Sequence, residues 1–129
     1  MKFSYTILYV HNVELTIDFY IKAFGCTLQF LDETKLYGAL ETGSTTLAFA
    51  DESLAKDNVG TFEKNNLNKK SPAGFEIAFT TDNVKHAYEH ALKSGAQSLQ
   101  PPLQKPWGQL VAYVLDINGI IVEIASPLS

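Results

Sequence analysis

The chain is poor in cysteine and in positive charge. Its 129 residues include one cysteine, Cys26, so neither an intramolecular disulfide nor a cysteine-based zinc cluster can form. Lysine and arginine number 10 against 14 aspartates and glutamates, which gives a formal net charge of -4. Such a surface offers no positive field for a phosphate backbone or an anionic membrane, so nucleic acid is not an expected partner.

Long hydrophobic runs are also missing. No segment approaches the roughly twenty apolar residues that a membrane helix needs, and residues 1–6 lack the hydrophobic stretch of a signal peptide. A lone cysteine suits a reducing compartment, so we expect a cytoplasmic protein with no membrane partner. Cys26 is expected to pack as a small apolar residue, because it alternates in step with Leu28 and Phe30 in a predicted strand.

What is present is a globular composition with many aromatic residues. Hydrophobic residues make up 46% of the chain, which includes eight Phe and six Tyr, and the length suits one domain. Helical spacing of apolar residues predicts a helix over residues 13–24, with Asn12 as its N-cap and Gly25 at its end. Strand-like runs surround this helix, at residues 3–10, 26–31, 35–41 and 45–50.

The same order of elements begins again after a polar segment over residues 51–72, which reads as a linker with room for a short helix. The second helix is bounded by Asn83 and Gly95, as the first is by Asn12 and Gly25. Strands are expected at 75–80, 96–99, 109–115 and 120–125, with a break at Pro101-Pro102 and an Asn-Gly turn at 118–119. The pattern predicts an α+β fold in a single domain, with one βαβββ module over about 1–50 and another over about 73–129.

Three segments carry a family resemblance: residues 8–20 with Gly25, residues 74–79 with 82–84, and residues 106–108 with 116–119 and Glu123. In this order they resemble the vicinal oxygen chelate superfamily of glyoxalases, bleomycin-resistance proteins and extradiol dioxygenases, and most of all its bleomycin-resistance-like branch. The resemblance implies curved mixed sheets whose concave faces enclose a cavity, with the helices outside. It also implies a homodimer.

Metal enzymes of this superfamily hold their ion with four side chains, on the first and last strands of each module. The resemblance places these positions at Tyr5, at Thr46 or Ala48, at Glu76 and at Glu123. Only the last keeps a residue that the metal enzymes use. Zinc favours His and Cys ligands, so a glyoxalase-type zinc or nickel site is not expected. Magnesium, manganese or calcium accept oxygen ligands, which leaves Glu76 and Glu123 as weak candidates for a divalent ion.

Strand alternation independently places Glu76 and Glu123 on one side of a sheet. Carboxylates in an apolar cavity must be paired, hydrogen-bonded, protonated, wetted or metal-bound. A pair with split pKa values would act as acid and base in a proton transfer, and a pair that is merely satisfied would line a binding pocket. Both readings stay open at this point.

Aromatic residues complete the candidate site. Trp107, between Pro106 and Gly108, is a candidate wall for a planar ligand or alternatively a core or interface residue. Tyr5 and Tyr113 are candidate cavity-lining residues. His86 and His90 have the spacing of a two-histidine metal motif, but they lie opposite the apolar stripe of their helix and are expected at the surface, and His11 is expected in a loop.

The sequence therefore favours a small-molecule-binding protein that works without a metal or other cofactor and sequesters a hydrophobic or aromatic compound. The alternative is a lyase, isomerase or dioxygenase of the same superfamily, which uses Glu76 and Glu123 as catalytic residues with or without a divalent metal.

Overall fold

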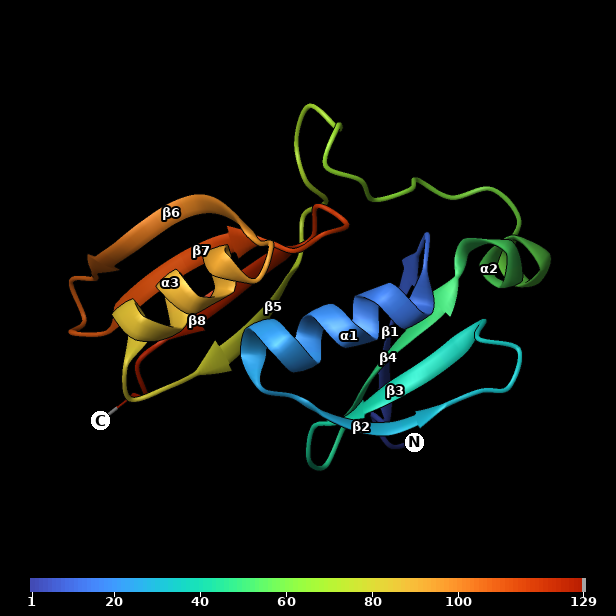
Figure 1. Cartoon of the computed structure of the whole chain (residues 1–129), viewed down its shortest axis with the longest axis horizontal. Helices are drawn as coiled ribbons and strands as arrows, with labels where there is room; N and C mark the ends of the chain where they lie inside the picture. Colours follow the sequence, from blue (N-terminus) through green and yellow to red (C-terminus); the bar gives the residue numbers. More distant parts are fainter. Residues whose placement is uncertain (129) are drawn as a thin grey trace. The chain divides into compact units, whose positions relative to one another are not determined.

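The structure, a computed structural model, describes residues 1–128 and confirms an α+β fold made of two βαβββ modules. The chain divides into two compact units, an N-terminal unit over Met1–Lys64 and a C-terminal unit from Asn65 onward. Each unit has its own four-stranded mixed sheet, and neither sheet is closed into a barrel. Figure 1 shows one long helix lying along each sheet.

The N-terminal unit contains four strands and two helices. Its sheet has the strand order β1-β4-β3-β2, in which the pairing of β1 with β4 is parallel and the others are antiparallel. The elements are β1 (Tyr5–Val10), α1 (Val13–Phe24), β2 (Thr27–Leu31), β3 (Tyr37–Glu41), β4 (Thr46–Asp51) and α2 (Glu52–Val59).

Helix α1 begins and ends where its sequence signals predict. The Asn12 Oδ1 accepts the N–H of Leu15 at 3.0 Å, and Gly25 adopts a left-handed φ of 70° that stops the helix. Fully buried Tyr20 on this helix packs against Phe49 on β4, with ring centroids 5.1 Å apart. One face of the sheet is thereby covered.

The C-terminal unit repeats this plan. Its sheet has the order β5-β8-β7-β6, in which β5 pairs with β8 in parallel at one edge of the sheet and the other pairs are antiparallel. Asn83 caps its helix by accepting the N–H of His86 at 3.1 Å. The elements are β5 (Glu76–Thr80), α3 (Val84–Lys93), β6 (Gln97–Gln104), β7 (Leu110–Leu115) and β8 (Ile121–Ala125).

The Asn-Gly turn predicted between the last two strands is present and is organised by a buried carboxylate. Asp116, with 0% of its surface exposed, accepts the N–H of Asn118 at 2.7 Å and the N–H of Ile120 at 2.9 Å. Gly119 follows with a φ of 80°, and a Cβ there would lie 2.6 Å from the carbonyl oxygen of Asn66. Glycine is therefore required at this turn by both conformation and space.

Two sequence predictions are wrong, and β-bulges explain both. The Pro101-Pro102 pair does not break the strand, because β6 continues through it to Gln104. The strand lies at the edge of its sheet, and its register with β7 shifts between Gln100 and Leu103. An edge strand with a bulge can hold prolines, since no ladder hydrogen bond from their nitrogens is needed.

The second error concerns Cys26, Leu28 and Phe30, which were expected to share one face. Cys26 lies before β2 and is half-buried. A register shift between Leu28 and Phe30 turns the Phe30 side chain to the face opposite Leu28. A shift at the matching place in β6, between Ser98 and Gln100, makes this bulge a shared feature of the two modules.

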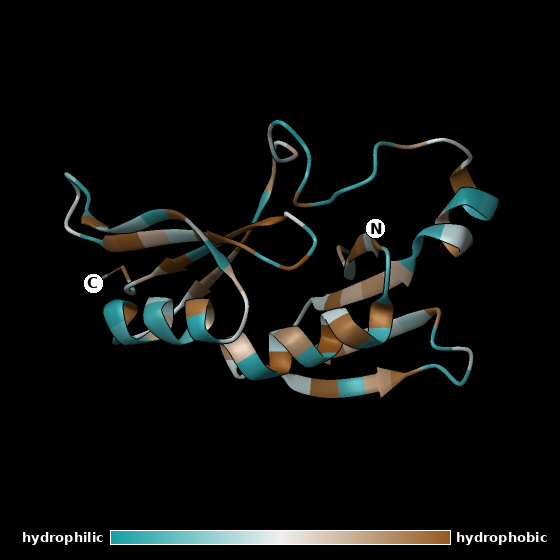
Figure 2. Ribbon diagram, turned by 45° about the horizontal axis from the view of Figure 1, so that its top comes forward, coloured by the Kyte–Doolittle hydropathy of each residue, from teal (hydrophilic) through white to brown (hydrophobic). Residues whose placement is uncertain are grey.

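The remaining differences lie at element ends and in the linker. The first strand starts at Tyr5 and not at residue 3, and the third strand at Tyr37 and not at residue 35. The polar linker holds the short helix α2, whose buried residue is Ala55. Figure 2 shows α2 and most of the connection after it as hydrophilic. In the described part of the chain, no helix is long and apolar enough to cross a membrane.

The buried Asp116 turn should matter more for stability than a similar exposed turn. We expect Asp116→Ala to destabilise the protein by about 2–4 kcal/mol, because two buried N–H groups lose their acceptor. Asp32→Ala is the matched control, since Asp32 accepts from Thr34 in an exposed turn. Urea unfolding of both variants checks this, and equal losses would contradict it.

Candidate functional site

Each sheet has one face packed on its helix and one face left open. In the N-terminal unit, Leu8 and Val10 are 5% and 0% exposed, whereas Tyr5 and Ile7, on the opposite side of β1, are 60% and 44% exposed. The predicted alternation along this strand is confirmed. The open faces are therefore where side chains are available for chemistry.

On the open face of the C-terminal unit, strand register places four side chains in one row. Ala78 pairs with Glu123, Glu123 with Tyr113, and Tyr113 with Gln100. Glu76 lies two residues before Ala78 on the same face of β5. The predicted site residues Glu76, Tyr113 and Glu123 thus come together on one sheet surface.

These three residues form a hydrogen-bonded acid cluster. The Tyr113 hydroxyl donates to Oε1 of Glu123 at 2.9 Å. Partial burial, the charge of Glu123 and a hydrogen bond between the two carboxyl groups raise the pKa of Glu76. Glu76 therefore keeps its proton to a higher pH than a free glutamate does.

Tyr113 belongs to the same electrostatic unit. Burial, the hydrogen bond to Glu123, and the charges of Glu123 and Glu76 raise the pKa of Tyr113 to about 12. The phenol is therefore a hydrogen-bond donor at neutral pH and not a base. It fixes one oxygen of Glu123 in place.

The matching row in the N-terminal unit has a different chemistry. Register pairs Ile7 with Ala48, Ala48 with Ala39, and Ala39 with Phe30. Ile7 and Ala78 hold equivalent places in the two modules, so Ala48 and not Thr46 is the counterpart of Glu123. No side chain in this row is ionisable.

Aromatic rings surround the two alanines of that row. Ala39 and Ala48 are 1% and 0% exposed. Phe30 and Tyr37 pack with ring centroids 5.7 Å apart, and burial followed by the charge of Tyr5 raises the pKa of Tyr37. The accessible surface of this face is therefore apolar, and larger side chains such as Tyr5, Ile7 and Phe30 form it in place of the two covered alanines.

The side chains at the superfamily's metal positions do not form a dedicated metal site. Two carboxyls and one phenol make a poor ligand set for zinc or nickel, and the N-terminal positions supply Tyr5 and Ala48. Among residues 1–128, no group of three or more His, Cys, Asp and Glu side chains is placed to hold a metal ion.

Comparison with known proteins gives the family. The model of the glyoxalase-like domain matches residues 3–129. The chain belongs to the glyoxalase-like domain family. This confirms the predicted membership of the vicinal oxygen chelate superfamily.

Relatives of this glyoxalase-like domain are distant in sequence. The uncharacterized protein YraH of Bacillus subtilis (strain 168) is 23% identical over 129 residues, which is 99% of this chain and 100% of YraH. A glyoxalase-related enzyme from Fulvimarina pelagi has 23% identity and a TM-score of 0.82, covering 98% of this chain and 88% of its own. A glyoxalase/bleomycin resistance protein/dioxygenase family enzyme from Burkholderia phytofirmans PsJN has 19% identity and a TM-score of 0.78. The match covers 95% of this chain and 96% of that enzyme. These structures support the fold.

Several candidate residues of this glyoxalase-like domain lie apart from the acid cluster. Trp107 lies between β6 and β7, is 66% exposed, and donates its indole N–H to Oε1 of Gln109 at 2.8 Å. His86 and His90 stack on the exposed side of α3 with centroids 6.4 Å apart. Burial raises the pKa of the Cys26 thiol, which agrees with a packing residue and not a nucleophile.

Sequence reasoning missed Phe30 and Tyr37 as members of the open face. The bulge in β2 hid Phe30, since a strict alternation assigns it to the helix side. Tyr37 could have been found, because its pairing with Ala50 follows from a hairpin between the third and fourth strands.

Removing the charge of Glu123 should lower the pKa of Tyr113 in this glyoxalase-like domain. In Glu123→Gln we expect the Tyr113 value to fall from about 12 toward the ordinary value of 10.0, with part of the rise kept because burial is its largest cause. NMR titration of tyrosine labelled at the ring carbon that carries the hydroxyl measures this. An unchanged Tyr113 curve would contradict the hydrogen-bonded cluster.

Glu76 should make stability depend on pH. Its pKa is raised above the ordinary 4.5, so the folded protein binds more protons than the unfolded chain above that pH. The stability from Glu76 is present below pH 4.5 and is lost as the pH rises through the raised value. In urea unfolding, we expect Glu76→Gln to reduce the loss of unfolding free energy with rising pH. Glu89→Gln, on the exposed side of α3, should show the same loss as the parent protein. Equal slopes in both variants would contradict this.

Proposed function

We propose that this protein is a metal-independent small-molecule-binding member of its family, which takes a planar hydrophobic or aromatic compound. The observation that carries the proposal is the apolar open face of the N-terminal unit. Its row of Ile7, Ala48, Ala39 and Phe30 replaces the ionisable row of the other module.

The apolar face suits a flat ring for a physical reason. Ala39 and Ala48 are covered by their neighbours, whereas Tyr5, Ile7 and Phe30 remain 60%, 44% and 44% exposed on the same face. An aromatic compound laid against these side chains would remove exposed ring surface from water and gain offset or edge-to-face ring contacts. Exposed aromatic rings that gather on one face are typical of a binding surface.

The acid cluster gives the open face of the C-terminal unit a polar character of its own. The Tyr113 phenol holds one oxygen of Glu123 in place, and the raised pKa of Glu76 keeps that carboxyl protonated to a higher pH than a free one. The proposed aromatic site on the N-terminal unit does not depend on this cluster.

The cellular location and the binding partners of the protein are also proposals. We propose that the protein acts in the cytoplasm as a homodimer, with no nucleic acid or membrane partner. The support is the charge of -4 and the apolar side chains exposed on the N-terminal sheet. Light scattering of the purified protein measures the oligomeric state.

A second candidate function is a lyase, isomerase or dioxygenase that uses Glu76 and Glu123. The raised pKa of Glu76 favours it, because one carboxyl would donate a proton while the other accepts one beside a substrate carbonyl. Metal analysis of protein purified without chelator separates the two candidates. Stoichiometric metal that is lost in Glu123→Gln, or turnover of a glyoxalase-type substrate that this change abolishes, would favour the enzyme.

A matched pair of variants tests the binding proposal. Phe30 and Leu28 are 44% and 45% exposed on the same strand, but they lie on opposite faces. With acetonaphthone as the probe, we expect Phe30→Ala to weaken binding about tenfold, because one ring contact of about 1.4 kcal/mol is lost. Leu28→Ala should bind as the parent does.

Binding is measured by NMR titration, with thermal shift as a second readout. Saturable changes at the amides of Ala39 and Ala48 are the expected result. An absence of any saturable change, or an equal loss of affinity in both variants, would overturn the proposed site.

A further inference from the structure

The N-terminal unit contains a cavity that none of the open-face row residues lines. It lies where β1 ends and α2 begins, closed by residues 60–64, and its volume is about 600 Å³. Sites for small molecules usually have volumes of about 300–1,000 Å³. Both its size and its mixed polar and aromatic lining are those of a ligand site.

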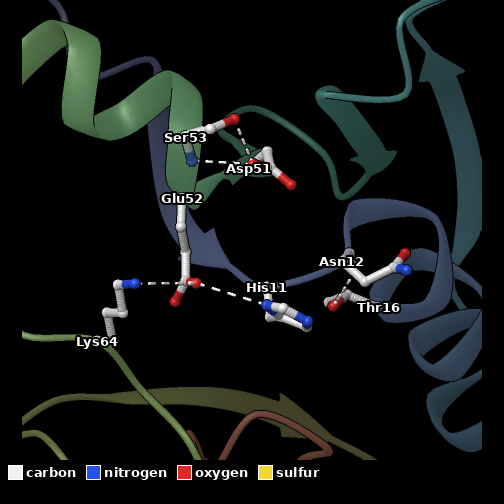
Figure 3. A network of polar contacts seen from close by, with 7 residues as sticks. All are labelled: His11, Asn12, Thr16, Asp51, Glu52, Ser53 and Lys64. Atoms are coloured by element: carbon white, nitrogen blue, oxygen red, sulfur yellow. Dashed lines mark hydrogen bonds and ion pairs between the residues drawn. The ribbon is translucent and has the colours of Figure 1, made fainter.

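Each of the two carboxylates that line this cavity has one oxygen engaged by the protein itself. One carboxylate oxygen of Asp51 accepts both the N–H of Ser53 at 2.9 Å and its hydroxyl at 2.6 Å. The other carboxylate, Glu52, has 13% of its side chain exposed and lies between His11 Nδ1 at 3.7 Å and Lys64 Nζ at 4.0 Å. Figure 3 shows Glu52 reaching between these two groups.

The donor groups of the lining are available instead. Lys56 lines the cavity one turn after Glu52, and within the described chain its ammonium group makes no ion pair. Thr61 lines it as well, and its hydroxyl makes no hydrogen bond to a described residue. Lys64 is held only by the 4.0 Å contact to Glu52. The cavity therefore offers a ligand the Lys56 ammonium and the Thr61 hydroxyl as donors.

An aromatic wall completes the cavity. The Phe62 ring lines it and makes an edge contact with Tyr9, with centroids 5.0 Å apart and planes at 60°. Gly60 brings this segment into place with φ 81° and ψ -137°, a backbone conformation that is essentially restricted to glycine. The ring contact with Tyr9 and the turn at Gly60 together hold the Phe62 ring in place.

From these observations we infer that this cavity binds a small organic carboxylate with an apolar body. The carboxylate lies against the Lys56 ammonium and the Thr61 hydroxyl, and the apolar body packs on the Phe62 ring. This site is separate from the open-face site proposed above. Because Lys56 and Lys64 are exposed, the affinity is expected to be weak, with a dissociation constant of around 1 mM.

An NMR titration of the full chain tests this inference with three probes of similar shape. Sodium benzoate is expected to give saturable shifts at the amides of Lys56, Thr61 and Phe62. Neutral benzyl alcohol and cationic benzylammonium are expected to bind more weakly. Equal binding of benzyl alcohol would overturn the anion site, and tighter binding of benzylammonium would assign the cavity to a cation held by Glu52.

Two lysine variants give the matched comparison. Lys56→Gln should weaken benzoate binding about fivefold, as expected for a partly exposed ion pair. Lys85→Gln, on the exposed side of α3 in the other unit, should leave it unchanged. Benzoate shifts that do not saturate, or an affinity that Lys56→Gln leaves unchanged, would overturn the site. Acetonaphthone binding measured on the same samples shows whether the open-face site stands or fails independently.

Discussion

The strict alternation of side chains along the parallel pairs β1–β4 and β5–β8 is the constraint on which both units depend. In each pair one face is buried under a helix, where side chains such as Val10, Phe49 and Val122 are 0% exposed. Burial of each such side chain stabilises the fold by about 1.5–3 kcal/mol, so the register cannot slip by one residue. The register also decides which side chains lie on the opposite face, although those side chains are not part of the core.

That freedom explains how one architecture carries two chemistries. The modules share their N-terminal helix caps, a parallel strand pair at one edge of each sheet and a bulge in the second strand, yet the open rows differ at every position. Glu123 and Tyr113 in one module correspond to Ala48 and Ala39 in the other. Side chains on the open face can change without loss of the core, which is why the repeat survives as a fold while its residues diverge.

The acid cluster contributes little to stability. A raised pKa for Glu76 means that the folded state disfavours its charged form, so the pair destabilises the protein at neutral pH. Groups that are kept despite such a cost are candidates for function. The same reasoning does not extend to Trp107, whose contacts are local and whose ring is mostly exposed.

Much of the fold could be predicted from the sequence, and the reasons are local. Asn12, Asn83 and Gly25 act within one or two turns of their helices, and the Asn118-Gly119 turn sets its own hairpin. The bulges could not be predicted in this way, because they depend on the partner strand. For this reason Phe30 was predicted on the wrong face of its strand, and the strand was predicted to end before Pro101-Pro102.

The candidate site was predictable only in part, for the same reason. Alternation alone put Glu76 and Glu123 on one face, but the hydrogen bond from Tyr113 depends on its pairing with Glu123 across two strands. The choice between Thr46 and Ala48 likewise needed the register of β1 with β4. The cavity beside α2 had no sequence signal, since its lining comes from a strand end, a helix and a loop.

The central claim is that Glu76 and Glu123 interact on the open face of the C-terminal unit and that this interaction raises the pKa of Glu76. Carbon NMR of the glutamate side-chain carboxyls, followed through a pH titration, tests it most directly. The account predicts that Glu76 titrates above the ordinary 4.5 and that Glu123→Gln moves its curve back toward that value. A Glu76 curve at the ordinary value, unmoved by Glu123→Gln, would contradict it.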